Sequence, residues 1–160
     1  MFQEEQFTRI AQQYMDTIFR VAFNYLKSPS EADDITQEVL IKLYQADKSF
    51  ESDDHLRHWL IRVTINCCKK SLLAPWRKVE SLENYIQSLS FQTSEHSELF
   101  YLTMSLPRKY RLAIYLYYYE DYSTEEIAKI LGIPKATVAT HLHRGRQLLK
   151  TKLQEANNHV

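Results

Sequence analysis

The segment STEEIAKILGIPKATVATHLHRGRQLL, residues 123–149, shows most clearly how this chain folds. Ser123 with Glu126 three residues later forms a capping box, which predicts that a helix begins at this point. Gly132 then ends this short helix, because only glycine takes a left-handed conformation there without penalty. Pro134 suits the first turn of a second, longer helix. Two helices joined by a tight turn in this way predict a helix-turn-helix, the unit that reads DNA.

The residue pattern also predicts which face of this unit is buried. Ala128 is small enough to let the two helices cross closely, and Val138 is expected to fill the crossing. Leu142 and Leu149 continue the buried stripe at helical spacing. The opposite face is expected to enter the major groove, where Thr and Arg can read base edges and Lys and Arg can neutralise phosphates. This DNA-reading face comprises Lys135, Ala136, Thr137, Thr140, His141 and Arg144. A helical hairpin used only for packing is the alternative.

Working outward, the N-terminal half predicts three amphipathic helices packed as a compact bundle. The first spans 5–26, where apolar residues recur every three or four positions, and Ser28-Pro29-Ser30 ends it. We expect Ser30 to cap the second helix, with Asp33 in a capping-box-like position. The third is expected at 54–73, with Trp59 on its inward stripe. The fold class is therefore all-α, with a three-helix N-terminal bundle and a C-terminal helix-turn-helix domain.

A flexible linker is expected between these two small domains. Residues 75–97 show no clear period and are rich in Ser, Gln and Glu. Helical spacing of apolar residues returns from position 98. The sequence thus predicts an N-terminal domain at 1–74, a linker at 75–97 and a C-terminal domain at 98–160.

The charged residues cancel over the whole chain, with 20 Lys and Arg against 20 Asp and Glu, but they are unevenly placed. Residues 55–79 and 127–153 each hold six basic residues and no acid, whereas 80–100 hold four Glu and no Lys or Arg. Two basic blocks separated by an acidic one suggest two contacts with a polyanion. Two solvated helix faces are the alternative interpretation.

Several classes of protein are excluded. The chain has no Gly-rich phosphate loop, no Ser/His/Asp set and no metal-ligand spacing, so we expect no enzyme activity, cofactor or metal site. Cys67 and Cys68 are adjacent and seldom have the geometry to pair with each other. The longest nearly apolar run, 112–119, is far shorter than the roughly 20 residues that span a bilayer. We therefore expect a soluble, cytoplasmic protein without membrane insertion.

The motifs together resemble bacterial sigma factors of the extracytoplasmic-function (ECF) group. Residues 106–111, 122–128, 137–138 and 142–146 are similar to the family's fourth region. Residues 32–39 are similar to its polymerase-binding helix, and 58–66 to the helix that reads and opens the promoter. The resemblance implies a factor that binds core RNA polymerase and directs promoter-specific initiation, through minus-ten melting and minus-thirty-five recognition. Its partners would be core polymerase, promoter DNA and, as for many members, an anti-sigma factor.

The resemblance also implies roles for single residues. A clamp helix of the polymerase's largest subunit would be bound by Asp34, Gln37 and Glu38. Asn66 would line the pocket for a base flipped from the minus-ten element, framed by the loop 49–53. The minus-ten contacts would be Phe50, Arg62, Asn66, Lys69 and Lys70. Phe50 is equally consistent with a loop aromatic tucked into the core, and Trp59 is interpreted as core.

The recognition helix departs from the family pattern, and two other interpretations of the whole chain stay open. Ala139, Thr140 and His141 stand where the family commonly has basic residues, so the DNA-facing side is less positive. A stand-alone helix-turn-helix regulator is the first alternative, although it needs neither the acidic helix nor Asn66. An interaction protein is the second, because the C-terminal half is rich in tyrosine, a residue enriched at interfaces. These tyrosines are Tyr110, Tyr115, Tyr117, Tyr118, Tyr119 and Tyr122.

Overall fold

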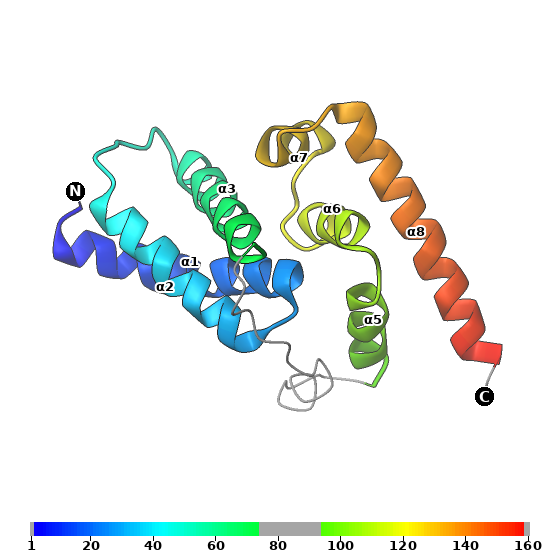
Figure 1. The fold of residues 1–160 in the computed structure, drawn as a ribbon. Coiled ribbons are helices and arrows are strands. Elements are labelled where there is room, and N and C mark those ends of the chain that lie inside the picture. Colours follow the sequence, from blue (N-terminus) through cyan, green and yellow to red (C-terminus); the bar gives the residue numbers. More distant parts are fainter. Residues whose placement is uncertain (1, 74–93, 159–160) are drawn as a thin grey trace. The chain divides into compact units, whose positions relative to one another are not determined.

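The computed structural model describes residues 2–73 and 94–158, and over these residues its regular secondary structure is entirely α-helical (Figure 1). The chain divides into two compact units, Met1–Glu80 and Ser81–Val160. These findings confirm the all-α fold class with two small helical domains. Most of the linker expected at 75–97 lies outside the described residues. Among the described residues, no helix has the length and apolar character that crossing a membrane requires.

The N-terminal unit is the expected three-helix bundle. It consists of α1 (Glu4–Leu26), α2 (Pro29–Gln45) and α3 (Asp53–Ser71), and each helix packs against the other two. Each contributes one apolar stripe to a shared core, as amphipathic helices of this length do. Side chains at the centre of this core are Ile18, Val21, Val39, Leu43, Leu60, Ile61 and Ile65.

The start of α2 differs from the prediction by two residues. Ser28, not Ser30, is the N-cap, and its Oγ accepts a hydrogen bond from the Glu31 backbone N–H at 3.2 Å. Pro29 occupies the first helical position, where its missing N–H costs nothing and its fixed φ already suits a helix. The proline was interpreted as a helix breaker, so the predicted cap fell on its far side.

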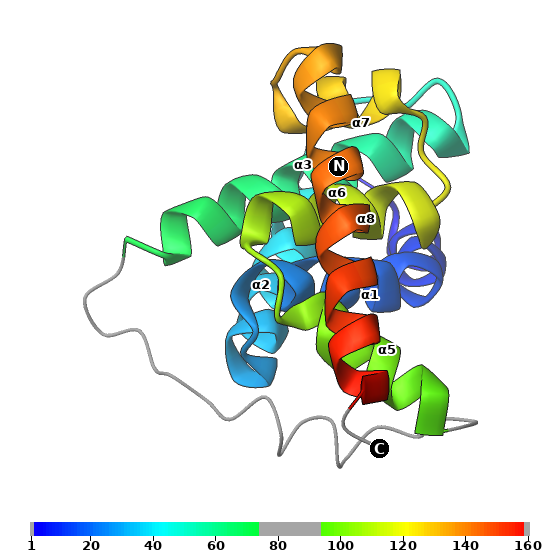
Figure 2. The same ribbon diagram turned by 90° about the vertical axis from the view of Figure 1, so that its right-hand side faces the viewer.

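The C-terminal unit is built around one long helix. It contains α5 (Ser94–Met104), α6 (Arg108–Tyr118), α7 (Thr124–Leu131) and α8 (Lys135–Asn158), and α8 contacts the other three. Figure 2 shows α8 crossing α6. α5 begins four residues before the predicted boundary at 98. The prediction placed the start too late because the first turn of α5 is polar and precedes the apolar pattern. The buried side chains include Met104, Leu106, Leu116, Ile127, Val138 and Leu142.

The predicted helix-turn-helix is confirmed in its local geometry. Ser123 and Glu126 form the complete capping box, in which each side chain accepts the other's backbone N–H at 3.1 Å. Gly132 has φ 67°, a left-handed conformation that closes the turn. Val138 is fully buried, as expected for the residue that fills the helix crossing.

A close approach of α6 and α8 was not predicted from the sequence. Ala128 is only half-buried, whereas Gly145 on α8 is buried against α6. A Cβ at Gly145 would lie 3.0 Å from Ile114 Cγ1 and 3.4 Å from Tyr110 Cβ, tighter than ordinary van der Waals contact to Ile114. Gly145 therefore allows α6 and α8 to touch, and this contact holds the N-terminal half of α6 beside α8.

A buried cation fixes the turn between α5 and α6. The Arg111 side chain is 3% exposed and its Nη1 donates to the Leu106 carbonyl at 2.9 Å and to the Met104 carbonyl at 3.5 Å. Burial, with a smaller contribution from Arg108, lowers the pKa of Arg111 to about 10. The guanidinium therefore stays charged at neutral pH and satisfies carbonyls at the end of α5.

Candidate nucleic-acid and partner interfaces

A row of basic and amide side chains follows one exposed face of α3. The row consists of four exposed residues, Arg62, Asn66, Lys69 and Lys70. They are separated by four, three and one residues, so they share one side of the helix. Trp59, three residues before Arg62, was predicted to lie in the core. It is instead half-buried on the same side of the helix as the row. At 1.5 Å per residue the row extends about 12 Å along the helix from Arg62 to Lys70. The structure thus brings together four of the five predicted minus-ten residues.

The fifth, Phe50, belongs to an aromatic cluster where the loop 46–52 meets α3. Its ring meets Trp59 edge-on at 5.4 Å and His55 at 5.3 Å, and it lies nearly parallel to Phe2 at 6.0 Å. The Lys48 ammonium lies 5.8 Å from the ring centroid. Phe50 is half-buried in this surface cluster, which adjoins the Trp59 end of the α3 row.

The loop is anchored to α3 by hydrogen bonds. Ser52 caps the helix, and its Oγ accepts from the His55 backbone N–H at 3.1 Å. The His55 ring in turn accepts from the Glu51 backbone N–H at 3.2 Å through Nδ1. His55 therefore holds the loop in place. The described residues contain no cluster of His, Cys, Asp or Glu that could hold a metal ion.

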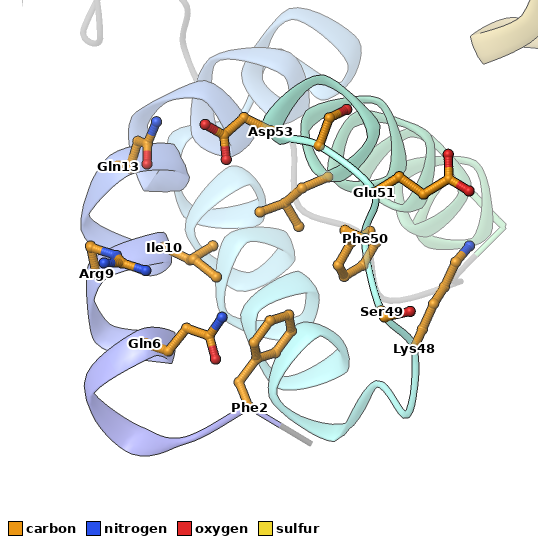
Figure 3. Close-up of a pocket in the computed structure, with 12 residues that line it drawn as sticks. Phe2, Gln6, Arg9, Ile10, Gln13, Lys48, Ser49, Phe50, Glu51 and Asp53 are labelled. Carbon is orange, nitrogen blue, oxygen red and sulfur yellow. The ribbon is translucent and has the colours of Figure 1, made fainter.

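A pocket of about 670 Å³ lies between the start of α1 and this loop (Figure 3). The figure shows Phe2, Ile10 and Phe50 facing the hollow. The predicted framing loop, 49–53, does line it, whereas Asn66 does not. Asn66 lies seven residues beyond Trp59, or about 10 Å along α3. Sequence reasoning missed the contribution of Phe2, which precedes α1, and of the α1 residues Gln6, Arg9, Ile10 and Gln13.

The predicted polymerase-binding residues share one face of α2. Asp34 and Gln37 are exposed and Glu38 is half-buried. Ile41, one turn beyond Gln37 and Glu38, is 56% exposed and places an apolar side chain on the same face. Cys67 of α3 lies beside Glu38: burial first, and then the Glu38 charge, raise the pKa of its thiol to about 11. The thiol therefore stays protonated, which argues against a reactive cysteine.

The predicted DNA-reading face of α8 is largely accessible. Lys135, Ala136, Thr140 and Arg144 are exposed, while Thr137 and His141 are partly covered. Lys135 Nζ lies 3.0 Å from Glu125 Oε1 of α7, and both side chains are more than half exposed. This bond to Lys135 lowers the pKa of Glu125. A carboxylate thus stands beside a cation that was predicted to meet phosphate.

Tyr110 of α6 contacts the same face from the side. The His141 ring meets Tyr110 edge-on, with ring centroids 5.6 Å apart and planes at 80°. Lys109 Nζ lies 5.1 Å from the Tyr110 ring centroid. The Arg144 guanidinium lies within hydrogen-bonding reach of the Tyr110 hydroxyl and lowers the pKa of Tyr110. Burial first, and then the charges of Lys109 and Arg144, lower the pKa of His141, so the imidazole is neutral at neutral pH.

Known proteins match the chain in both units. The Sigma-70 region 2 model matches residues 10–78, and the Sigma-70, region 4 model matches 98–149. The ECF RNA polymerase sigma factor SigW of Bacillus subtilis is 32% identical over 170 residues, covering 95% of this chain and 91% of SigW. The ECF RNA polymerase sigma-E factor of Escherichia coli is 28% identical, covering 94% and 88%.

Two solved structures share the fold. The sigma factor RpoE from Bartonella quintana, in complex with the anti-sigma factor NepR, matches with a TM-score of 0.68 at 20% identity, covering 94% of this chain and 98% of RpoE. CnrH, in complex with the cytosolic domain of CnrY, matches with a TM-score of 0.69 at 19% identity, covering 96% and 90%.

The fold and the two matched regions define a sigma factor of the sigma-70 type. Within that class, the chain belongs to the ECF group of RNA polymerase sigma factors. It is therefore a promoter-specific transcription initiation factor that acts with RNA polymerase and is not itself an enzyme. This membership excludes the stand-alone regulator that the sequence had left as an alternative.

Proposed function

We propose that the two units divide promoter recognition between them. Residues 1–74 bind core polymerase and the minus-ten element, residues 98–160 bind the minus-thirty-five element, and 75–97 connect them. The observation that carries this proposal is the acid-free row on α3, which begins beside the Phe50 and Trp59 rings and is exposed along its length. Basic side chains next to aromatic rings are the features that bind single-stranded nucleic acid.

On α3 the roles follow from side-chain chemistry. Arg62, Lys69 and Lys70 neutralise phosphates of the separated strand. The Asn66 amide offers a donor and an acceptor to the edge of an unpaired base. Phe50 offers a ring on which a base can stack, at the border of the pocket beside α1. These contacts exist only with an unpaired base, so they offset the cost of opening the duplex.

On α2 the exposed acidic face is the polymerase contact. Asp34 and Glu38 can form charge-assisted hydrogen bonds with basic groups of a clamp helix, and Gln37 can add an amide contact. Ile41 adds apolar area beside them, which interfaces of this kind commonly contain at their centre.

On α8 the predicted face reads the upstream element. Thr137, Thr140 and His141 can contact base edges, while Lys135 and Arg144 contact phosphates or guanine. Because these contacts require chromosomal DNA and polymerase, the proposed location of the protein is the cytoplasm. The face carries few cations of its own, so the neighbouring Lys109 adds useful charge.

An anti-sigma factor is the proposed inhibitory partner. RpoE of Bartonella quintana, which shares this fold, was solved with one. In the C-terminal unit, Tyr117, Tyr118 and Tyr119 are between 37% and 56% exposed at the end of α6. Tyrosine is among the residues enriched in protein interfaces. This exposed group is the proposed contact.

The minus-ten proposal is tested with Asn66→Ala in holoenzyme assembled from purified core polymerase. Promoter opening, followed by permanganate reactivity of unpaired thymines, should fall about tenfold, the effect of losing one good base contact. Affinity for core polymerase should stay unchanged. The matched control is Gln12→Ala, which truncates an exposed helical amide on α1. Equal loss of core affinity and opening in Asn66→Ala would refute the assignment.

A further inference from the structure

Three groups from two helices converge on the single side chain of Tyr110. Tyr110 is 9% exposed, so its ring is mostly buried in the C-terminal unit, and its hydroxyl lies at the surface. The ring contacts His141, the Arg144 guanidinium lies within hydrogen-bonding reach of the hydroxyl, and the Lys109 ammonium lies near the ring. Sequence reasoning placed Tyr110 only among tyrosines that could contact a protein partner.

We propose that Tyr110 is a positioning residue for minus-thirty-five recognition, whose ring orients His141 and whose hydroxyl orients Arg144 toward the duplex. This inference rests on the proposed function of the α8 face. Arginine on a helix surface samples many rotamers, and ordering it on binding weakens the interaction. An Arg144 side chain already held by Tyr110 loses less freedom when it meets DNA, and it is directed to one base pair or phosphate.

The packing of α6 against α8 explains why Tyr110 can reach these two side chains. Gly145 directly follows Arg144, and a Cβ there would lie 3.4 Å from Tyr110 Cβ. The absence of a side chain at Gly145 therefore brings the α6 backbone close to α8 at the level of Arg144. The same approach places Lys109 at the edge of the face, where it adds positive charge for the DNA backbone.

The arrangement also assigns different chemistry to the two α8 residues. His141 is surrounded by Lys109 and Arg144 and is partly covered by Tyr110, so it is neutral at neutral pH. A neutral imidazole carries one donor and one acceptor, which suits a base edge better than a phosphate. Arg144 keeps its charge and forked donors, which suit guanine or phosphate.

The test uses holoenzyme and a promoter duplex selected from a randomised library, together with its single base-pair substitutions in the minus-thirty-five element. Tyr110→Phe removes the hydroxyl and keeps the ring. It should weaken binding of the selected duplex roughly three- to tenfold, as expected for one hydrogen bond to a charged group. It should also reduce discrimination at the base pair that Arg144→Ala affects, and leave minus-ten opening unchanged.

Tyr118→Phe is the matched control. The Tyr118 hydroxyl accepts a hydrogen bond from Arg146 Nη1 at 2.9 Å, away from the predicted DNA-reading face. This variant loses an equivalent tyrosine–arginine bond and should bind the duplex as the wild type does. A double variant, Tyr110→Phe with Arg144→Ala, should be no weaker than Arg144→Ala alone.

The outcomes separate the two proposals. If Arg144→Ala leaves duplex binding unchanged, the assigned role of the α8 face is wrong. If Arg144→Ala weakens binding but Tyr110→Phe matches the wild type, or the two losses add, the positioning role is wrong and the α8 face keeps its role. Thermal unfolding of each variant checks that the binding losses do not reflect loss of fold.

Discussion

Replacing Glu125 with Gln should tighten promoter binding, because it removes a competitor for Lys135. The two groups lie 3.0 Å apart with side chains 60% and 70% exposed. An exposed pair of this kind contributes little to folding stability, so its loss should change that stability only slightly. In the variant, Lys135 no longer has to give up its ion pair with residue 125 before it binds phosphate. The variant also removes a negatively charged carboxylate close to the DNA. Duplex affinity should therefore rise about two- to fivefold at low salt.

The salt dependence of binding gives a second readout of this change. A lysine that moves fully onto phosphate releases about one further counterion, so the slope of log K against log salt should steepen by up to about 0.9. Fluorescence anisotropy of labelled promoter duplex over a salt series measures affinity and slope together. Lys135→Ala should make the slope shallower by a similar amount, and it should abolish the gain from Glu125→Gln.

Glu126→Gln is the matched control for charge. It removes one negative charge in the same helical turn, but from a residue whose oxygen caps the helix rather than bonding Lys135. The reasoning is refuted if Glu125→Gln leaves affinity and slope unchanged or weakens binding. An equal gain in Glu126→Gln would show that only overall charge matters, not the bond to Lys135.

Two further predictions concern the same unit. Gly145→Ala should destabilise it by about 1 kcal/mol in urea unfolding, since overpacking against Ile114 costs about 1–3 kcal/mol and exceeds the ~1 kcal/mol gain in helix propensity. A rise in stability would contradict the contact. Because the folded-state pKa of His141 is lowered from 6.5, the unfolded state binds more protons, so this group lowers stability as pH falls through about 6.5. His141→Gln should therefore lose less stability than the wild type between about pH 7.5 and about pH 5.5, and an equal loss would show that His141 is not the group responsible.

Structural features that depend only on residues close together in the sequence could be predicted from it. The capping box at Ser123 and the turn at Gly132 depend only on local backbone chemistry, and both are confirmed. Local chemistry was misjudged where two serines flank one proline, because Pro29 was interpreted as ending a helix rather than beginning one. The face of each helix followed from apolar spacing, except that Trp59 lies at the edge of the core.

Features that depend on distant segments could not be predicted in this way. The pocket forms because Phe2 and the start of α1 lie beside a loop more than forty residues later. The contact of Tyr110 with His141 and Arg144 requires α6 to pack closely on α8, and nothing local marks Gly145 as the residue that permits it. The pairing of Lys135 with Glu125 likewise joins two helices across the turn.

The most direct test of this account is transcription by core polymerase with the wild type, Asn66→Ala and Arg144→Ala on a promoter library randomised in both elements. The account predicts that the wild type selects transcripts with two conserved elements, that Arg144→Ala relaxes selection only upstream, and that Asn66→Ala relaxes it only at the minus-ten element. Specific transcripts whose upstream element is insensitive to Arg144→Ala, or a loss of both elements in either variant, would contradict the division of work between α3 and α8.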